Sequence, residues 1–161
     1  MPEGCRFVRT VLFVCTGNTC RSPLAEALTR VEAERRNIDV NVSSAGIYAT
    51  DGTPAFPQSV DAAARRGADL TQHRSRRLEL AALADADLVL TMTPGQLGAL
   101  RTELGRELNV ALLTDLLPAD HDRHGDPVSD PFGGSEEDYE EVARLLGECV
   151  GYVLDRWAEF E

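Results

Sequence analysis

The segment that most constrains this chain is residues 11–23, where an apolar run leads directly into a small polar loop that begins with a cysteine. Residues 11–14 are Val-Leu-Phe-Val, a composition typical of a buried parallel strand. Cys15 follows this run, Arg21 comes six residues later, and Pro23 suits the first turn of a helix. A strand, a loop and a helix in this order predict an α/β fold with the loop at the carboxyl end of a strand.

The loop from Cys15 to Arg21 has the layout of an anion site built around a nucleophile. The backbone N–H groups of consecutive loop residues can converge on one phosphate, and the dipole of the following helix adds to their field. The same field stabilises a thiolate, so Cys15 is expected to ionise readily and to be reactive. The planar guanidinium of Arg21 can bind two phosphate oxygens at once. The sequence therefore predicts a phosphate-binding loop around a nucleophilic sulfur.

Neighbouring residues strengthen this interpretation beyond the spacing of Cys and Arg, which is weak evidence by itself. Gly17 and Asn18 both tolerate positive φ, as a tight loop requires. Ser22 is expected to cap the helix that follows. The competing interpretation is an ordinary buried cysteine at a strand end with an unrelated surface arginine, and the context favours the phosphate-binding loop.

Residues 15–23, Cys-Thr-Gly-Asn-Thr-Cys-Arg-Ser-Pro, closely resemble the signature of the low-molecular-weight protein tyrosine phosphatase family. That family also carries an Asp-Pro pair late in its chain, and Asp130 followed by Pro-Phe-Gly-Gly is similar to it. The resemblance covers roughly residues 8–158. It implies one phosphatase domain over residues 1–161 with a doubly wound, four-stranded parallel sheet, helices on both faces and the phosphate-binding loop after the first strand.

The resemblance also implies a role for each residue of the site. Cys15 would attack phosphorus and carry a phosphocysteine intermediate, while Arg21 would clamp the phosphate oxygens. Asp130 would protonate the leaving group and then act as general base toward water. The residues implied to bind or support the phosphate are Thr16, Gly17, Asn18, Thr19, Cys20, Ser22, Ser44 and His73. Neither a metal nor a cofactor is required.

Two contacts within this set follow from the same resemblance. The hydroxyl of Ser22 is expected to donate to the sulfur of Cys15 and to ease its departure as a leaving group, in addition to capping the helix. Asn18 is expected to brace the loop against Ser44 and His73, as the matched positions do in the family. His73 is therefore a supporting residue rather than a catalyst.

The acidic loop before the last helix leaves two alternatives open. Asp126 also precedes a proline and lies only four residues before Asp130, so spacing alone cannot choose the acid. The Phe-Gly-Gly that follows favours Asp130. The alternative for either aspartate is a purely structural role as a turn carboxylate, which is the commoner role of Asp before Pro. His121 and His124 could suggest a metal site, but the cysteines of the loop lack the spacing of zinc ligands, so no metal is expected.

The other cysteines are expected to differ in function. Cys20 lies in the same loop as Cys15, and such a neighbour can form a reversible disulfide that protects the nucleophile from further oxidation. The alternative for Cys20 is a small residue that only packs. Cys5 and Cys149 are expected to be inert.

The substrate pocket is expected to involve Thr19 and Phe132. Family members that act on phosphotyrosine usually carry a bulky aliphatic residue at the position of Thr19 and two aromatics after Asp-Pro, whereas here Gly133 follows Phe132. Both features resemble the bacterial protein arginine phosphatase branch. Losing one aromatic wall also weakens stacking with a phenol ring, so the sequence favours phosphoarginine, with phosphotyrosine as the alternative. A thioredoxin-coupled arsenate reductase would need two more cysteines near residues 90–94, and this segment contains no cysteine. A silent phosphate-binding module would not need Cys15, Arg21 and Asp130 to be intact.

Composition limits the partners. The net charge is −11, which argues against nucleic acid or an anionic membrane as the main partner. The family resemblance implies a phosphorylated protein as the partner. The first residues lack a signal-peptide pattern, and no apolar run approaches the length of a membrane span. A catalytic thiolate also requires reducing conditions. We therefore expect a cytoplasmic protein that is a monomer or a weak dimer.

Apolar periodicity predicts strands alternating with helices. The predicted strands cover residues 8–15, 38–44, 87–92 and 109–113. The predicted helices cover residues 22–36, 58–66, 77–84, 94–104 and 136–159, with Gly67 ending the second and Pro94 starting the fourth. A long loop over residues 115–134 is expected to be functional or mobile.

Overall fold

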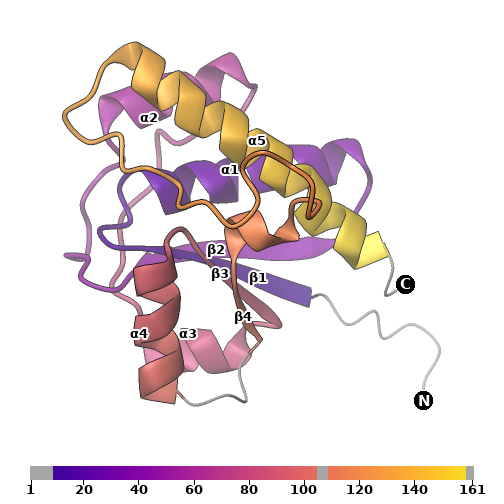
Figure 1. The fold of residues 1–161 in the computed structure, drawn as a ribbon. Coiled ribbons are helices and arrows are strands. Elements are labelled where there is room, and N and C mark those ends of the chain that lie inside the picture. The colour runs from indigo at the N-terminus through magenta and orange to yellow at the C-terminus, as the bar shows by residue number, and fades with distance from the viewer. Residues whose placement is uncertain (1–8, 105–108, 159–161) are drawn as a thin grey trace.

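The computed structural model describes residues 9–104 and 109–158 and has a parallel sheet at its centre (Figure 1). Its strands are β1 (Arg9–Cys15), β2 (Val40–Gly46), β3 (Leu88–Thr91) and β4 (Val110–Leu112). They lie in the order β2-β1-β3-β4, and every neighbouring pair is parallel. The predicted doubly wound, four-stranded fold is therefore confirmed.

Helices cover both faces of the sheet, as Figure 1 shows. One layer holds α1 (Arg21–Arg35), α2 (Pro57–Arg65) and α5 (Glu136–Ala158), and the other holds α3 (Leu80–Asp85) and α4 (Pro94–Leu104). The alternation along β1 explains why both faces need cover, since Val11 and Phe13 join the core under α1 and α5 while Leu12 and Val14 join the core on the α3 side. All four side chains are fully buried. A strand that is apolar on both faces is stable only between two helical layers.

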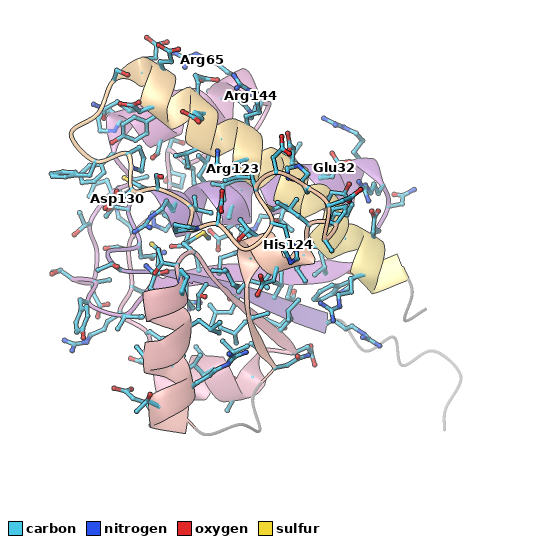
Figure 2. The ribbon with its side chains drawn as sticks, in the orientation of Figure 1. Glu32, Arg65, Arg123, His124, Asp130 and Arg144 are labelled. Carbon is cyan, nitrogen blue, oxygen red and sulfur yellow. The ribbon has the colours of Figure 1, made fainter. Side chains whose placement is uncertain are left out.

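Helix α5 crosses the top of the molecule and closes the larger core. Its inward stripe is buried, as the periodicity predicted: Val142, Leu145, Leu146, Cys149, Val150, Val153 and Trp157. At its first turns Arg65 of α2 forms ion pairs with Glu136 and Glu140 (Figure 2). Exposed pairs of this kind contribute up to about 1 kcal/mol each, so apolar burial is the larger force that holds α5 in place.

Several element boundaries differ from the predicted ones, because tertiary hydrogen bonds set the ends. The second strand covers Val40–Gly46 rather than residues 38–44, since its pairing with β1 begins at Arg9 and ends at Cys15. The third strand ends at Thr91, because the side chain of Gln96 accepts the hydrogen bond from the backbone N–H of Met92. The fourth strand ends at Leu112, where a 3-10 helix, η1 (Leu113–Leu116), begins.

The helices show the same effect. The predicted helix over residues 77–84 begins only at Leu80, because Leu78 donates its backbone N–H to the carbonyl of Gly46 and holds this stretch extended beside β2. The helix predicted over residues 58–66 starts at Pro57, and Gly67 follows its end with φ 77°, as predicted. Pro94 starts α4, also as predicted. The proposed start of the first strand at residue 8 and the end of the last helix at residue 159 lie outside the described residues.

Within residues 9–104 and 109–158, no helix combines the length and the apolar character that crossing a membrane requires.

Candidate active site

The loop after β1 is held between the last residue of that strand, Cys15, and the first residue of α1, Arg21. Asn18 takes the left-handed conformation with φ 56°, whereas Gly17 does not have positive φ. A close approach also shapes the loop from outside, since a Cβ at Gly46 would lie 2.7 Å from the carbonyl oxygen of Thr16 and 2.9 Å from the backbone nitrogen of Asn18. Only glycine at the end of β2 lets the loop lie this close to the sheet.

Two donors converge on the buried sulfur of Cys15. The backbone nitrogen of Asn18 lies 3.3 Å from Sγ, and the hydroxyl oxygen of Ser22 lies 2.9 Å from it. The predicted role of Ser22 as the helix cap is wrong, because α1 begins one residue earlier and Cys20 occupies the cap position with no side-chain cap bond. The predicted contact of Ser22 with the sulfur is present, since its hydroxyl faces Cys15 Sγ from inside the first turn.

The side chain of Asn18 decides which way the Ser22 hydroxyl points. Its Oδ1 accepts from the backbone N–H of Arg76 at 3.0 Å, which fixes the amide orientation because a backbone N–H can only donate. Its Nδ2 then donates to Ser22 Oγ at 2.8 Å and to Ser44 Oγ at 2.9 Å. Since the lone pairs of Ser22 receive the amide proton, its own hydrogen is available for Cys15, and a thiolate there gains a charge-assisted hydrogen bond.

The predicted neighbours of Asn18 are all in place. Ser44 comes from β2, and His73 lies 2.8 Å through Nε2 from the carbonyl oxygen of Asn18. Because a carbonyl only accepts, Nε2 of His73 carries the hydrogen. The structure thus brings Cys15, Asn18, Ser22, Ser44 and His73 into one connected network.

The guanidinium of Arg21 is buried, and only 6% of the residue is exposed. Its NH1 donates to the carbonyl of Val128 at 2.9 Å, and its NH2 lies 3.8 Å from Oδ2 of Asp130. Its Nε is buried and has no hydrogen-bond partner among the described residues. A buried N–H of this kind is costly without an acceptor, and an anion over the loop would supply one.

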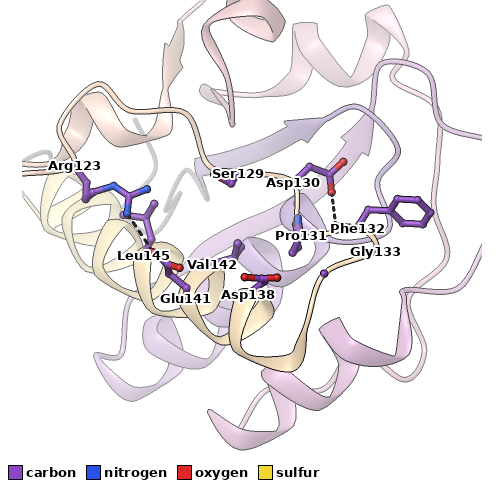
Figure 3. Close-up of a pocket in the computed structure, with 11 residues that line it drawn as sticks. Arg123, Ser129, Asp130, Pro131, Phe132, Gly133, Asp138, Glu141, Val142 and Leu145 are labelled. Carbon is purple, nitrogen blue, oxygen red and sulfur yellow. Dashed lines mark hydrogen bonds and ion pairs between the residues drawn. The ribbon is translucent and has the colours of Figure 1, made fainter.

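Asp130 and Asp126 occupy different surroundings. Asp130 lines the recess above Cys15, and its Oδ1 accepts from the backbone N–H of Phe132 at 3.1 Å (Figure 3). Asp126 does not line this recess, and its carboxylate accepts from Nε of Arg123 at 3.0 Å. The geometry therefore favours Asp130 as the proton donor.

The recess above Cys15 has a volume of about 240 Å³ and is lined by residues 15–21 together with Asp130, Phe132 and Phe56. The rings of Phe56 and Phe132 lie with their centroids 5.3 Å apart. Gly133 leaves the Asp-Pro segment with one aromatic ring, as expected, and Phe56, from the segment before α2, adds a second ring that was not predicted. The backbone N–H of Phe56 donates to the carbonyl of Thr19 at 3.0 Å, and this hydrogen bond holds the ring of Phe56 beside the loop.

The family model described as low molecular weight phosphotyrosine protein phosphatase matches residues 10–158. The chain belongs to this family. It is therefore a low molecular weight protein phosphatase, an enzyme whose substrates are phosphorylated proteins.

Three similar proteins differ in the substrate that their names give. A protein-arginine-phosphatase of Bacillus subtilis is 41% identical over 141 residues, covering 87% of this chain and 91% of its own. A low molecular weight protein-tyrosine-phosphatase, PtpB of Staphylococcus epidermidis, is 33% identical over 144 residues, covering 89% and 95%. The solved structure of the YwlE arginine phosphatase, a serine mutant with a phosphorylated active-site serine, has a TM-score of 0.83 at 36% identity and covers 91% of this chain and 94% of its own.

Cys20 of this phosphatase is buried on the side of the loop that faces α5. Its Sγ lies 3.9 Å from the hydroxyl of Tyr139, and burial raises the pKa of its thiol to about 11. Cys15, Cys20 and Cys149 are all free thiols. Burial also raises the pKa of Cys149 to about 12, while Cys5 lies outside the described residues.

The two histidines of the acidic loop have protein partners. Nε2 of His121 lies 2.9 Å from Glu148 Oε2, and Nδ1 of His124 lies 2.8 Å from the carbonyl of Leu117. Among the described residues no group of three or more His, Cys, Asp or Glu side chains could hold a metal ion.

Two supporting residues were not predicted. Arg76 donates its backbone N–H to Asn18 and its Nε to the carbonyl of Ser44 at 2.9 Å. Gln96 is 7% exposed; its Oε1 accepts from Thr93 N at 3.0 Å, and its Nε2 donates to Thr16 Oγ1 at 3.1 Å. A sequence signal for Gln96 exists, because Thr-Pro-Gly-Gln at residues 93–96 is the capping-box pattern of a helix start.

Proposed function

We propose that this phosphatase removes phosphate from arginine side chains of proteins through a phosphocysteine at Cys15. The observation that carries the proposal is the recess itself, whose lining combines the small polar Thr19 with two neighbouring phenylalanine rings, those of Phe56 and Phe132. A planar guanidinium stacks on aromatic faces and also needs polar contacts at its edges. The similarity to arginine phosphatases supports the same substrate.

In the first step Sγ of Cys15 attacks phosphorus and the P–N bond to the arginine side chain breaks. Backbone N–H groups of the loop and the Arg21 guanidinium stabilise the negative charge that spreads over the equatorial oxygens. Asp130 gives its proton to the departing nitrogen, so the arginine side chain leaves as a guanidinium. The products of this step are the dephosphorylated arginine side chain of the protein and phosphocysteine.

In the second step a water molecule attacks the phosphocysteine and the S–P bond breaks. The carboxylate of Asp130, left by the first step, accepts the proton of the water. Sγ of Cys15 departs as a thiolate and receives hydrogen bonds from Asn18 N–H and the Ser22 hydroxyl. Inorganic phosphate is released, and the enzyme returns to its starting state without a metal or a cofactor.

Phosphotyrosine is the second candidate, and one observation favours it. The rings of Phe56 and Phe132 provide two apolar surfaces for a phenol, so stacking alone does not exclude tyrosine. The choice depends on Thr19, whose replacement by a larger aliphatic side chain would remove a polar group from the recess.

The test compares kcat/KM for matched phosphoarginine and phosphotyrosine peptides, with rates corrected for the spontaneous hydrolysis of the P–N bond. The wild-type chain should prefer phosphoarginine, and Thr19→Ile should shift the ratio toward phosphotyrosine by roughly 10- to 200-fold. Thr102→Ile, on the exposed surface of α4, is the matched control and should keep the wild-type ratio. A wild-type preference for phosphotyrosine that Thr19→Ile leaves unchanged would overturn the arginine proposal.

The working environment is part of the same proposal. A cysteine that acts as a thiolate needs reducing conditions, so we place the enzyme in the cytoplasm. We also propose that it is a monomer or a weak dimer. Size-exclusion chromatography with light scattering checks the oligomeric state.

A further inference from the structure

A second and larger cavity lies on the other side of the segment that carries Asp130 (Figure 3). Its volume is about 420 Å³, within the range of pockets that hold small ligands. It is enclosed between residues 129–134 and the first turns of α5. Asp130 and Phe132 line both this cavity and the catalytic recess, so one short segment separates the two.

The floor of the cavity is apolar. Pro131, Val142 and Leu145 contribute to its lining, and all three residues are buried. An apolar floor of this kind suits the aliphatic part of a long side chain, such as the methylene stem of arginine or lysine.

The charged groups around this floor are mostly acidic. Asp130, Asp138 and Glu141 line the cavity, and Arg123 is its one basic lining residue. Arg123 donates to Asp126 at 3.0 Å and lies 3.7 Å from Glu141, so two carboxylates already balance its charge.

Asp138 is the carboxylate that remains for a ligand. Its Oδ2 accepts from the backbone N–H of Ser135 at 2.9 Å, and its own N–H donates to Ser135 Oγ at 3.2 Å, which makes a capping box at the start of α5. Within residues 9–104 and 109–158 no cationic side chain forms an ion pair with it. An exposed carboxylate beside an apolar floor complements a side chain that carries a cation on an aliphatic stem.

We propose that this cavity binds an arginine or lysine side chain of the substrate protein itself, close in sequence to the phosphorylated residue. The inference rests on the proposed function as a protein phosphatase and adds a preference for basic flanking sequence. Neighbouring residues of an extended peptide are about 3.3 Å apart along the chain, so a peptide lying across residues 130–132 can reach both recesses. The phosphorylated side chain enters the recess above Cys15, and the basic side chain enters the cavity beside Asp138.

The experiment measures kcat/KM for a set of phosphopeptides that each carry a single arginine or a single glutamate near the phosphorylated residue. This residue is placed in turn at each of the two positions before and the two positions after the phosphorylated one. The ratio of the basic to the acidic peptide at the preferred position is compared in wild type, Asp138→Asn and Glu137→Gln. The asparagine keeps an acceptor for Ser135 N–H but removes the charge. Glu137 lies in the same first turn, is exposed and does not line the cavity, so its variant removes an equal charge from the helix start.

The wild-type enzyme should favour the basic peptide, and Asp138→Asn should reduce the ratio by about two- to five-fold, as for one exposed ion pair. The reduction should come from a higher KM for the basic peptide, because the contact is the same in the ground state and the transition state. Glu137→Gln should keep the wild-type ratio. A ratio of one in the wild type, or an equal fall in both variants from the general negative charge of the chain, would overturn the proposal.

The assay separates this inference from the proposed substrate. The flanking ratio is read on whichever of phosphoarginine and phosphotyrosine the enzyme hydrolyses faster. Faster hydrolysis of phosphotyrosine would refute the arginine substrate, and the flanking ratio would still decide whether the cavity reads a basic side chain.

Discussion

Removing the Ser22 hydroxyl should separate the two chemical steps of this phosphatase. In Ser22→Ala the sulfur of Cys15 loses the hydroxyl that lies 2.9 Å away and keeps only the backbone N–H of Asn18 at 3.3 Å. A hydrogen bond to a charged group contributes about 1.5–3 kcal/mol. Since about 1.4 kcal/mol corresponds to a factor of ten, full loss of this bond in one step would slow it by roughly 10- to 150-fold.

The two steps should not be affected equally. In the first step the missing donor no longer stabilises the attacking sulfur but leaves it more nucleophilic, so the two effects partly cancel. In the second step negative charge develops on the departing sulfur, and nothing offsets the missing donor. Hydrolysis of the phosphocysteine should therefore become rate-limiting, and kcat should fall more than kcat/KM.

The assay is stopped-flow release of para-nitrophenol from para-nitrophenyl phosphate. Ser22→Ala should give a burst with an amplitude near one equivalent per enzyme, followed by a slow steady state. Thr29→Val is the matched control, because it removes another buried hydroxyl from α1 that donates to the carbonyl of Ala25 and not to the sulfur. A kcat of Ser22→Ala within two-fold of wild type, or a fall without a burst, would refute the reasoning.

Three further predictions concern the acid and the other cysteines. Asp130→Ala should slow substrates with poor leaving groups by about 10²–10⁴-fold and activated aryl phosphates far less, whereas Asp126→Ala should not show this pattern; the reverse result would identify the wrong acid. Mild peroxide should inactivate the enzyme reversibly through a disulfide between Cys15 and Cys20, and Cys20→Ser should recover less activity with a thiol reductant; equal recovery would count against this role. Burial raises the pKa of Cys20 from 9.0 to about 11 and that of Cys149 to about 12, so above pH 9 the unfolded chain releases these protons first. The free energy of unfolding, measured with urea, should therefore fall as pH rises from 9, by on the order of 3 kcal/mol for Cys20 alone, and a flat profile would contradict the burial argument.

The parts of the site that are contiguous in sequence could be predicted from it. The strand, the loop and the start of the helix lie within residues 11–23, so the apolar run, the cysteine and the arginine already define their own local structure. The contacts of Asn18 with Ser44 and His73 were anticipated only through the family resemblance, because no local pattern connects residues so far apart in the chain.

The parts that depend on tertiary contacts were missed or misread. The contact of Ser22 with the sulfur of Cys15 was expected, but its additional role as a helix cap is wrong, because α1 begins one residue earlier, at Arg21, and the N-cap position falls on Cys20. The sequence does not point to Phe56, because its ring reaches Phe132 only after α2 has packed against α1 and α5. The start of α3 was misplaced because Gly46 holds the preceding residues in an extended form.

The hydrogen bond from Arg21 NH1 to the carbonyl of Val128 has a consequence for how the two halves of the catalytic machinery communicate. Val128 is fully buried and comes two residues before Asp130, so the phosphate clamp and the proton donor share one anchor. A movement of the acid segment that breaks this bond frees the guanidinium, and a reorientation of the guanidinium releases the segment. An oxyanion that holds Arg21 in its present orientation therefore also stabilises the placement of Asp130. By thermodynamic reciprocity, an ordered Asp130 segment strengthens oxyanion binding by the same free energy.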